Sequence, residues 1–312
     1  MTVRILQGDC RNVLKTLPDE SVHCVVTSPP YWGLRDYGIA DQIGLGQTPA
    51  AFVRDLVAVF QEVRRVLRDD GTLWLVLDDS YATDAKGERG VDKSTLSGGA
   101  WQMRAHPPKL ARGDWRGDGY KRKDLIGIPW RVALALQEDG WWLRCDVIWS
   151  KTSCMPENVQ DRPTRAHEYV FLLSKSQHYH YDADAVREPD VGMDHPRNIL
   201  QQPEPSGGVL KPNTGLRTAE GRNRRSVWTV GPQPYAGGHT ASFPPALIEP
   251  CILAGCPIGG TVLDPFGGAG TTGLVADRHG RDAILIELNP EYAAMAERRI
   301  RGDAPLFAEV TS

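Results

Sequence analysis

The alternation of short apolar runs with amphipathic stretches is the feature that most limits how this chain folds. Seven runs are almost continuously apolar, at residues 3–7, 22–27, 72–77, 142–149, 169–173, 261–263 and 283–286. Runs of this kind are typical of strands that are buried on both faces of a sheet. Because helical stretches separate most of them, the sequence predicts an α/β fold with a mostly parallel, seven-stranded sheet flanked by helices.

The longest helix is predicted at residues 50–67. Its apolar side chains recur at helical spacing and share one face, and Asp69-Asp70-Gly71 marks its end. Shorter helices are predicted at 129–139 and 244–254, which end at Gly140 and Gly255, and a closing helix at 292–301.

Two stretches interrupt this pattern, residues 82–123 and 188–238, which are rich in Gly, Pro, Arg and polar residues. Residues 86–124 carry 10 Lys or Arg against 5 Asp or Glu, and residues 211–225 carry 5 against 1. The formal net charge of the whole chain is −3, so the remainder is acidic, at −12. Long loops in compact domains are either functional or disordered, and this charge distribution favours a polyanionic partner that meets the two basic segments.

The cysteines and the apolar runs bear on the cellular compartment. The 6 cysteines are dispersed, with no Cys-x-x-Cys pair and no histidines at zinc spacing, which favours a reducing compartment and no structural metal. No secretory signal is predicted at the start, where MTVRILQGDC runs directly into a strand, and no run approaches the length of a membrane span. The sequence therefore predicts a cytoplasmic protein with no membrane attachment.

Residues 261–273 read TVLDPFGGAGTTG, a strand followed by a glycine turn and the start of a helix. Gly268, Gly270 and Gly273 match the GxGxxG pattern, in which glycines bring backbone close to a ligand at a helix N-terminus. The next strand ends in Glu287, 19 residues after Gly268, where a carboxylate can accept both hydroxyls of a ribose. The pattern therefore predicts a nucleotide-like cofactor.

Two cofactor classes compete for this turn. A dinucleotide such as NAD needs further βαβ units, but only 25 residues follow Glu287. S-adenosylmethionine fits better, because the Asp264 carboxylate can meet an ammonium group while amides and threonine hydroxyls meet a carboxylate. The remaining alternative is a turn that only packs strand on helix.

Residues 27–33 read TSPPYWG and follow the predicted strand at 22–27, at the end where α/β proteins place their sites. Pro29 and Pro30 remove two amide donors and stiffen the turn, which leaves the Ser28 hydroxyl and the Pro29 carbonyl as acceptors. Such acceptors can bind the hydrogens of an exocyclic amine and free its lone pair to attack a methyl sulfonium. Tyr31 is expected to stack on a base held outside the duplex. A proline turn with a packed tyrosine is the alternative.

With both motifs present, the chain resembles the β class of amino-methylating DNA methyltransferases, which act on N4 of cytosine or N6 of adenine. TSPPYW at 27–32 resembles the catalytic motif IV of that family, and VLDPFGGAGTT at 262–272 resembles its cofactor motif I. Gly8-Asp9, Phe243 with the residues after it, and Glu287 also match family positions around the cofactor. The resemblance covers nearly the whole chain outside the two basic inserts.

The resemblance implies the S-adenosylmethionine-dependent methyltransferase fold as a single domain over residues 1–312. The expected parts are a catalytic-motif half (1–81), a basic insert (82–123), sheet strands with a hairpin (124–187), a target-recognition insert (188–238) and a cofactor-binding half (239–312). The implied catalytic residues are Ser28, Pro29, Pro30 and Tyr31. The implied cofactor-binding residues are Asp9, Thr27, Phe243, Asp264, Pro265, Phe266, Gly268, Gly270, Thr271, Thr272, Glu287 and Asn289.

The identity of the methylated base rests on Ser28. Cytosine-N4 enzymes of the family usually carry Ser at this position and adenine enzymes usually carry Asp or Asn, so Ser28 favours N4-methylcytosine, with N6-methyladenine as the alternative. A DNA-binding protein with a degenerate pocket is a further alternative, which the intact motifs disfavour. An RNA substrate is another alternative, and the motifs alone do not exclude it.

Double-stranded DNA is the expected partner, and the resemblance implies a companion restriction endonuclease and a homodimer as further expectations. Six basic residues are expected to neutralise phosphates, Lys121, Arg122, Lys123, Arg222, Arg224 and Arg225. Trp101, Trp115 and Tyr120 lie among the basic residues of the first insert and are expected to support a flipped-out strand or to wedge into the duplex. Residues 78–81 and 166–169 are expected to line the base pocket.

Overall fold

All seven predicted strands are present in the computed structural model, which describes residues 1–33, 42–82, 118–154, 156–189, 221–233, 243–303 and 309–311. They are β1 (Thr2–Gln7), β2 (Val22–Thr27), β3 (Leu67–Leu77), β4 (Trp142–Lys151), β5 (His167–Ser174), β7 (Thr261–Asp264) and β8 (Asp282–Glu287). Two short edge strands add to them, β6 (Val227–Val230) and β9 (Glu309–Thr311). The α/β fold class is confirmed, and the sheet carries nine strands rather than seven.

The strands lie in the order β6-β4-β5-β3-β2-β7-β8-β1-β9. All neighbouring pairs are parallel except those that β5 makes with β3 and β4. The chain proceeds outward from β2 to β3 on one side and from β7 to β8 on the other. The strand order therefore reverses between β2 and β7, which is where open α/β sheets bind their ligands.

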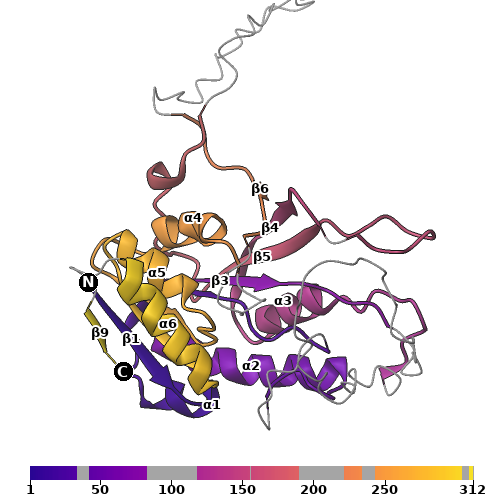
Figure 1. Ribbon diagram of the computed structural model, residues 1–312, viewed down its shortest axis with the longest axis horizontal. Coiled ribbons are helices and arrows are strands. Elements are labelled where there is room, and N and C mark those ends of the chain that lie inside the picture. Colours follow the sequence, from indigo (N-terminus) through magenta and orange to yellow (C-terminus); the bar gives the residue numbers. More distant parts are fainter. Residues whose placement is uncertain are drawn as a thin grey trace, which may run out of the picture.

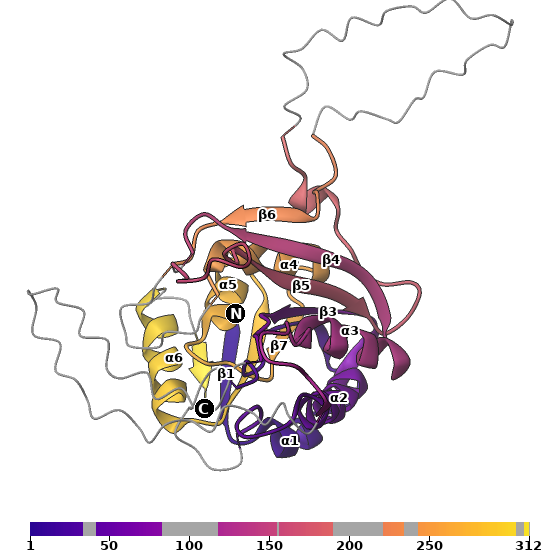
Figure 2. The same ribbon diagram turned by 90° about the vertical axis from the view of Figure 1, so that its right-hand side faces the viewer.

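Helices cover both faces of the sheet (Figures 1 and 2). The helices are α1 (Cys10–Val13), α2 (Pro49–Val66), α3 (Ile128–Glu138), α4 (Pro245–Gly255), α5 (Thr271–Arg278) and α6 (Pro290–Asp303), with 3-10 turns at Leu14–Thr16 and Asp184–Val186. Side chains of α2 and α3 share one buried cluster with Val25 of β2, while α4, α5 and α6 share the other with Val26. Successive side chains of a strand point to opposite faces, so the buried strands supply both clusters.

The end of α2 agrees with the prediction within one residue, but the turn signal after it has a different role. The helix ends at Val66 and β3 begins at Leu67 without an intervening loop. The register between β2 and β3 then shifts, because Val22 pairs with Leu67 while Cys24 pairs with Thr72. Residues 68–70 are exposed in this irregularity, so the turn signal at Asp69-Asp70-Gly71 marks a bulge inside the strand instead of the helix end. In the part of the chain that the structure describes, no helix is both long and apolar enough to cross a membrane.

Candidate functional site

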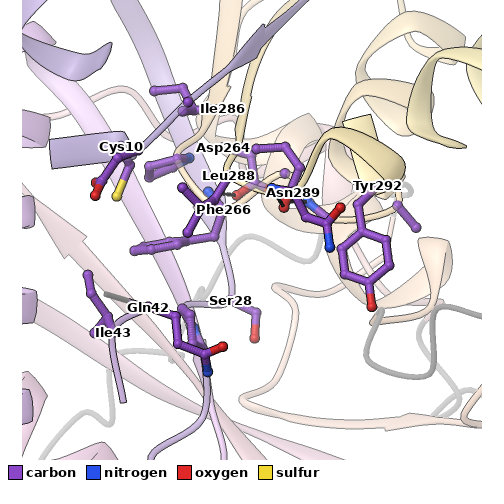
Figure 3. Close-up of a pocket in the computed structure, with 18 of the residues that line it drawn as sticks. Cys10, Ser28, Gln42, Ile43, Asp264, Phe266, Ile286, Leu288, Asn289 and Tyr292 are labelled. Carbon is purple, nitrogen blue, oxygen red and sulfur yellow. Dashed lines mark hydrogen bonds between the residues drawn. The ribbon is translucent and has the colours of Figure 1, made fainter. Parts of the chain in front are cut away.

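A pocket lies at the carboxyl ends of four adjacent parallel strands, β2, β7, β8 and β1. It spans about 900 Å³ of space that is not filled by protein atoms, part of it open to solvent. Figure 3 shows that its residues converge from the N-terminal segment, the loop after β2 and the turn after β7. Eleven of the predicted site residues line it: Asp9, Ser28, Pro30, Phe243, Asp264, Pro265, Phe266, Gly268, Thr271, Glu287 and Asn289.

The glycine turn, residues 265–270, joins β7 to α5. Gly268 and Gly270 have φ values of +50° and +78°, a left-handed backbone that favours glycine. The two glycines serve different purposes. The Gly268 amide donates to the Glu287 carboxylate at 2.7 Å on the pocket wall. Gly270 instead allows α5 to pack on α6, because a Cβ at this position would lie 2.8 Å from the Cβ of Ala296.

Asp264 is a buried hub between the turn and the loop after β2. Its Oδ1 accepts hydrogen bonds from the Thr27 hydroxyl at 2.6 Å and from the Phe266 amide at 3.0 Å. Its Oδ2 accepts from the Thr272 hydroxyl at 2.6 Å. Burial raises the pKa of Asp264 to about 6, although these three donors favour the charged form. Thr27 and Thr272 do not line the pocket, so they act on it through Asp264.

Glu287 is fixed at the end of β8. Each oxygen of its carboxylate accepts one backbone amide, from Gly268 at 2.7 Å and from Asn289 at 2.8 Å. Burial raises the pKa of this carboxyl, and the backbone amides of Asn289, Gly268 and Leu288 oppose the shift. A carboxylate has about four lone-pair positions, so each oxygen of Glu287 keeps capacity for a ligand hydroxyl. The Asn289 side chain accepts from the Glu291 amide in the first turn of α6.

Asp9 caps the short helix α1 and is held by Arg11. It accepts from the Arg11 backbone amide at 2.8 Å and from Nε and Nη2 of the Arg11 guanidinium. Burial raises the pKa of Asp9, but the hydrogen bonds from Arg11 outweigh it and the pKa lies below its usual value. Gly8 donates its amide to the Glu287 carbonyl at 2.9 Å, which joins this segment to β8.

The 28–31 loop, which follows β2, reaches from the pocket to a second polar group. Ser28 and Pro30 line the pocket, whereas Pro29 and Tyr31 are not among its lining residues. The Tyr31 hydroxyl donates to the Glu168 carboxylate at 2.6 Å. The Tyr31 hydroxyl therefore has a partner within the protein, which the sequence motif did not predict. Stacking of the Tyr31 ring on a base stays a prediction.

The basic residues predicted to meet phosphates have partners within the protein. Lys121 lies 3.9 Å from Asp124, and Lys123 pairs with Asp161 at 2.5 Å. At the second insert, Arg222 and Arg225 both pair with Glu188, and the Arg224 guanidinium lies 4.7 Å from the centre of the Trp228 ring. Arg122 also has an interaction partner.

The aromatic residues of the first insert are only partly described. Trp101 and Trp115 lie outside the described residues. Tyr120 packs under the guanidinium of Arg131, whose centre is 5.0 Å from the ring, so this tyrosine has an intramolecular partner.

Several pocket residues escaped the sequence analysis. Cys10, Arg11, Gln42, Ile43, Leu288 and Tyr292 also line the pocket. Leu288 and Cys10 adjoin predicted residues and could have been found by extending each motif by one position. Gln42 and Ile43 follow the loop after β2 in a segment with no motif, so only the folded chain reveals them.

The chain holds one Pro-Cys dipeptide, Pro250–Cys251, the arrangement of a thiol that attacks carbon 5 of cytosine. Both residues are buried inside α4, and burial raises the pKa of the Cys251 thiol far above its usual value. The thiol contacts the Leu247 carbonyl of its own helix at 3.7 Å. A buried, protonated thiol is inert, so this dipeptide offers no nucleophile to the pocket.

Comparison with known proteins places this geometry among DNA-modifying enzymes. The family model described as DNA methylase, for N6 and N4 methylation, matches residues 22–298. The Type II methyltransferase M.Cfr9I of Citrobacter freundii is 48% identical over 299 residues, which cover 96% of this chain and 88% of the relative. The Type II methyltransferase M.XycI of Xanthomonas campestris pv. cyanopsidis is also 48% identical, over 96% of this chain and 87% of the relative.

A solved structure shares the fold at low sequence identity. The PvuII DNA methyltransferase (cytosine-N4-specific) superposes with a TM-score of 0.63 and 18% identity, over 99% of this chain and 96% of that one. At this identity the likeness shows the fold alone.

Proposed function

The chain belongs to the DNA methylase family of N6- and N4-methylating enzymes, which depend on S-adenosylmethionine, and from this premise we propose that it methylates the N4 amine of cytosine in double-stranded DNA. The observation that carries the proposal is that one pocket is lined both by Ser28 and by the glycine turn with Glu287. A methyl donor and a methyl acceptor must meet in a single enclosed space, and this pocket offers the two sets of side chains that would hold them.

The donor set of the pocket fits S-adenosylmethionine. Glu287 would accept the ribose hydroxyls, and Asp264 has a lone pair on Oδ2 beyond the three donors that it already binds. Phe266 and Phe243 supply apolar surface on the pocket wall. When bound, S-adenosylmethionine would supply a methyl group on a positively charged sulfur: the nitrogen–carbon bond forms as the sulfur–carbon bond breaks, S-adenosylhomocysteine leaves, and the methylated amine releases one proton to water.

The 28–31 loop would hold the base after it has turned out of the duplex. The Ser28 hydroxyl and the Pro29 carbonyl would accept the two hydrogens of the exocyclic amine, which makes its lone pair available for direct in-line transfer. Two prolines keep the loop stiff, so little conformational entropy is lost when the base is bound. The main contribution of the protein is then the positioning of two reactants.

The choice of cytosine rests on Ser28, in line with the family pattern described above. A hydroxyl can also accept from the N6 amine of adenine, so N6-methyladenine is the second candidate within the same architecture. The Type II relatives support a restriction-modification role with a companion endonuclease, and a homodimer stays a prediction from family resemblance.

Product analysis tests the proposal. The purified protein is incubated with S-adenosylmethionine and unmethylated DNA of mixed sequence, and the DNA is digested to nucleosides for mass spectrometry. N4-methylcytosine is the expected product, and a reaction without S-adenosylmethionine is the control. N6-methyladenine would overturn the assignment of the base but leave the family intact, and no methylated nucleoside would overturn the proposed activity.

A further inference from the structure

A second buried carboxylate holds the far end of the 28–31 loop. Glu168 on β5 accepts the Tyr31 hydroxyl at 2.6 Å on Oε2, and its Oε1 forms an ion pair with Lys151 at the end of β4. Only 7% of the Glu168 side chain and 22% of the Lys151 side chain are exposed. Neither residue is among those that line the pocket.

The sheet explains why these groups meet. β4 and β5 pair in antiparallel fashion with Ser150 opposite His167, so Lys151 and Glu168 lie on neighbouring strands at the same edge. Tyr31 approaches from the loop after β2, 137 residues away in sequence from its partner. Burying a charged pair costs free energy of desolvation, and an apolar pair of similar volume is often as stable. Stability alone therefore gives little reason for a Glu and a Lys here.

The loop is anchored at both ends by buried carboxylates. Thr27, just before the loop, donates to Asp264, and Tyr31, its last residue, donates to Glu168. Ser28, Pro29 and Pro30 lie between the two anchors. Asp264 belongs to the glycine turn, so the first anchor sets the loop against the cofactor side of the pocket, while the second sets it against β5.

Resting on the proposed function, we propose that Glu168, neutralised by Lys151, is a positioning residue for methyl transfer that acts through the Tyr31 hydroxyl. An ionised carboxylate accepts a stronger hydrogen bond than a neutral group does, and Lys151 balances its charge inside the protein. The bond stops the Tyr31 ring from turning and fixes the acceptors of Ser28 and Pro29 where the amine must arrive. Catalysis by positioning is sensitive to displacements of about 1 Å, so the loss of one anchor is felt in the rate.

The charges around Glu168 agree with this role. Burial raises the pKa of Glu168, the charge of Asp78 adds to the shift, and Lys151 opposes it. Asp78 itself is paired with Arg165 at 2.5 Å, so the groups that face Glu168 are Tyr31, Lys151 and this second ion pair. Lys151 and the hydrogen bond from Tyr31 both favour the ionised form of Glu168, against burial and the charge of Asp78.

A double-mutant cycle tests the proposal in the full-length protein. Tyr31→Phe removes the hydroxyl together with its hydrogen bonds to Glu168 and Ser28, and Glu168→Gln removes only the charge. Each single variant is expected to lower the single-turnover rate of methyl transfer at saturating DNA and cofactor by about ten-fold, the size expected for a hydrogen bond to a charged group. The affinity for S-adenosylmethionine is expected to stay within about two-fold of wild type, because the anchor touches the loop and not the cofactor side. Tyr31→Phe leaves the Glu168–Lys151 pair in place, so it remains informative if Glu168→Gln folds poorly.

The energetic coupling between the two substitutions distinguishes loss of the positioning bond from a general loss of structure. The double variant is expected to be no slower than the slower single variant, because both changes break the same interaction. Tyr179→Phe is the matched control, since it removes a tyrosine hydroxyl that accepts from Arg144 at 3.3 Å, and it should keep the wild-type rate. A wild-type rate for Tyr31→Phe, additive losses in the double variant, or a parallel loss of cofactor affinity would each overturn the proposal. A wild-type protein that transfers no methyl group would instead overturn the proposed function.

Discussion

At the scale of single residues, a substitution of Ser28 gives the most direct test of the proposed chemistry. Its hydroxyl lines the pocket, while the buried contacts that hold the loop come from its neighbours Thr27 and Tyr31. Ser28→Ala removes one acceptor and, with it, the hydrogen bond between Ser28 and the Tyr31 hydroxyl, while the bonds of Thr27 to Asp264 and of Tyr31 to Glu168 keep both partners. The single-turnover rate is expected to fall by about a hundred-fold, as for other interactions made mainly in the transition state, with little change in cofactor affinity. Equal losses of rate and affinity would contradict the assigned role.

Asp264 gives a prediction about pH. The pKa of this carboxyl is about 6 in the folded protein without ligand, so it is mostly protonated at pH 5 and mostly ionised at pH 7. A cationic ligand binds the ionised form better, so the affinity for S-adenosylmethionine is expected to rise about ten-fold between these values. Titration calorimetry across this range measures the effect. In Asp264→Asn the step near pH 6 should disappear, and a flat wild-type profile would show that Asp264 serves only to hold Thr27 and Thr272.

At the scale of elements, the glycine turn both lines the pocket and allows α5 to pack on α6. Gly270 has φ +78° and faces the Ala296 Cβ, so Gly270→Ala meets both backbone strain and a clash. Gly259 is the matched control, because it has φ +75° but nothing within 4 Å of an added Cβ. Urea unfolding is expected to show a loss of about 3 kcal/mol for Gly270→Ala and about 1 kcal/mol for Gly259→Ala. Equal losses would mean that α5 and α6 adjust to the extra methyl group.

The helices and strands also show which parts of the fold local sequence patterns can predict. The seven inner strands and the helices at 50–67, 129–139, 244–254 and 292–301 were predictable, because buried strands and amphipathic helices have strong apolar signatures. The edge strands β6 and β9 have 4 and 3 residues and pair on one side only, so their sequences carry no comparable pattern. The bulge at residues 68–70 was read as a helix end, since Asp-Asp-Gly is a turn signal in either setting.

At the scale of the whole molecule, the motifs predicted which residues gather at the pocket but not how they hold one another. Thr27 meets Asp264 across 237 positions of sequence, and Tyr31 meets Glu168 across 137. Such contacts depend on the strand order β3-β2-β7-β8-β1, which no local pattern specifies. Gln42 entered the pocket for the same reason. The sequence therefore predicts which residues form the site better than it predicts the long-range hydrogen bonds that hold them in place.

The distribution of charge leads to a prediction about DNA binding. The chain has a net charge of −3, yet residues 86–124 and 211–225 carry net charges of +5 and +4. An acidic body repels DNA, so binding is expected to depend on these segments and to weaken steeply with salt. Individual residues should differ. The Lys121 side chain is 84% exposed and its ammonium group lies as far as 3.9 Å from the Asp124 carboxylate. The Arg222 side chain is 33% exposed and forms an ion pair with Glu188.

The slope of log affinity against log salt concentration separates these residues. Lys121→Ala is expected to reduce the magnitude of the slope by about 0.9, the loss of one phosphate contact, because its ammonium group is free to reorient toward DNA. Arg222→Ala should leave the slope unchanged, because Glu188 already neutralises the guanidinium. Arg301→Ala is the control, since this arginine pairs with Glu297 at 2.7 Å on α6, outside both basic segments. Arg301→Ala is expected to keep the wild-type slope. If Lys121→Ala kept it as well, Lys121 would not contact a phosphate, and the contacts would have to come from residues outside the basic part of the first insert.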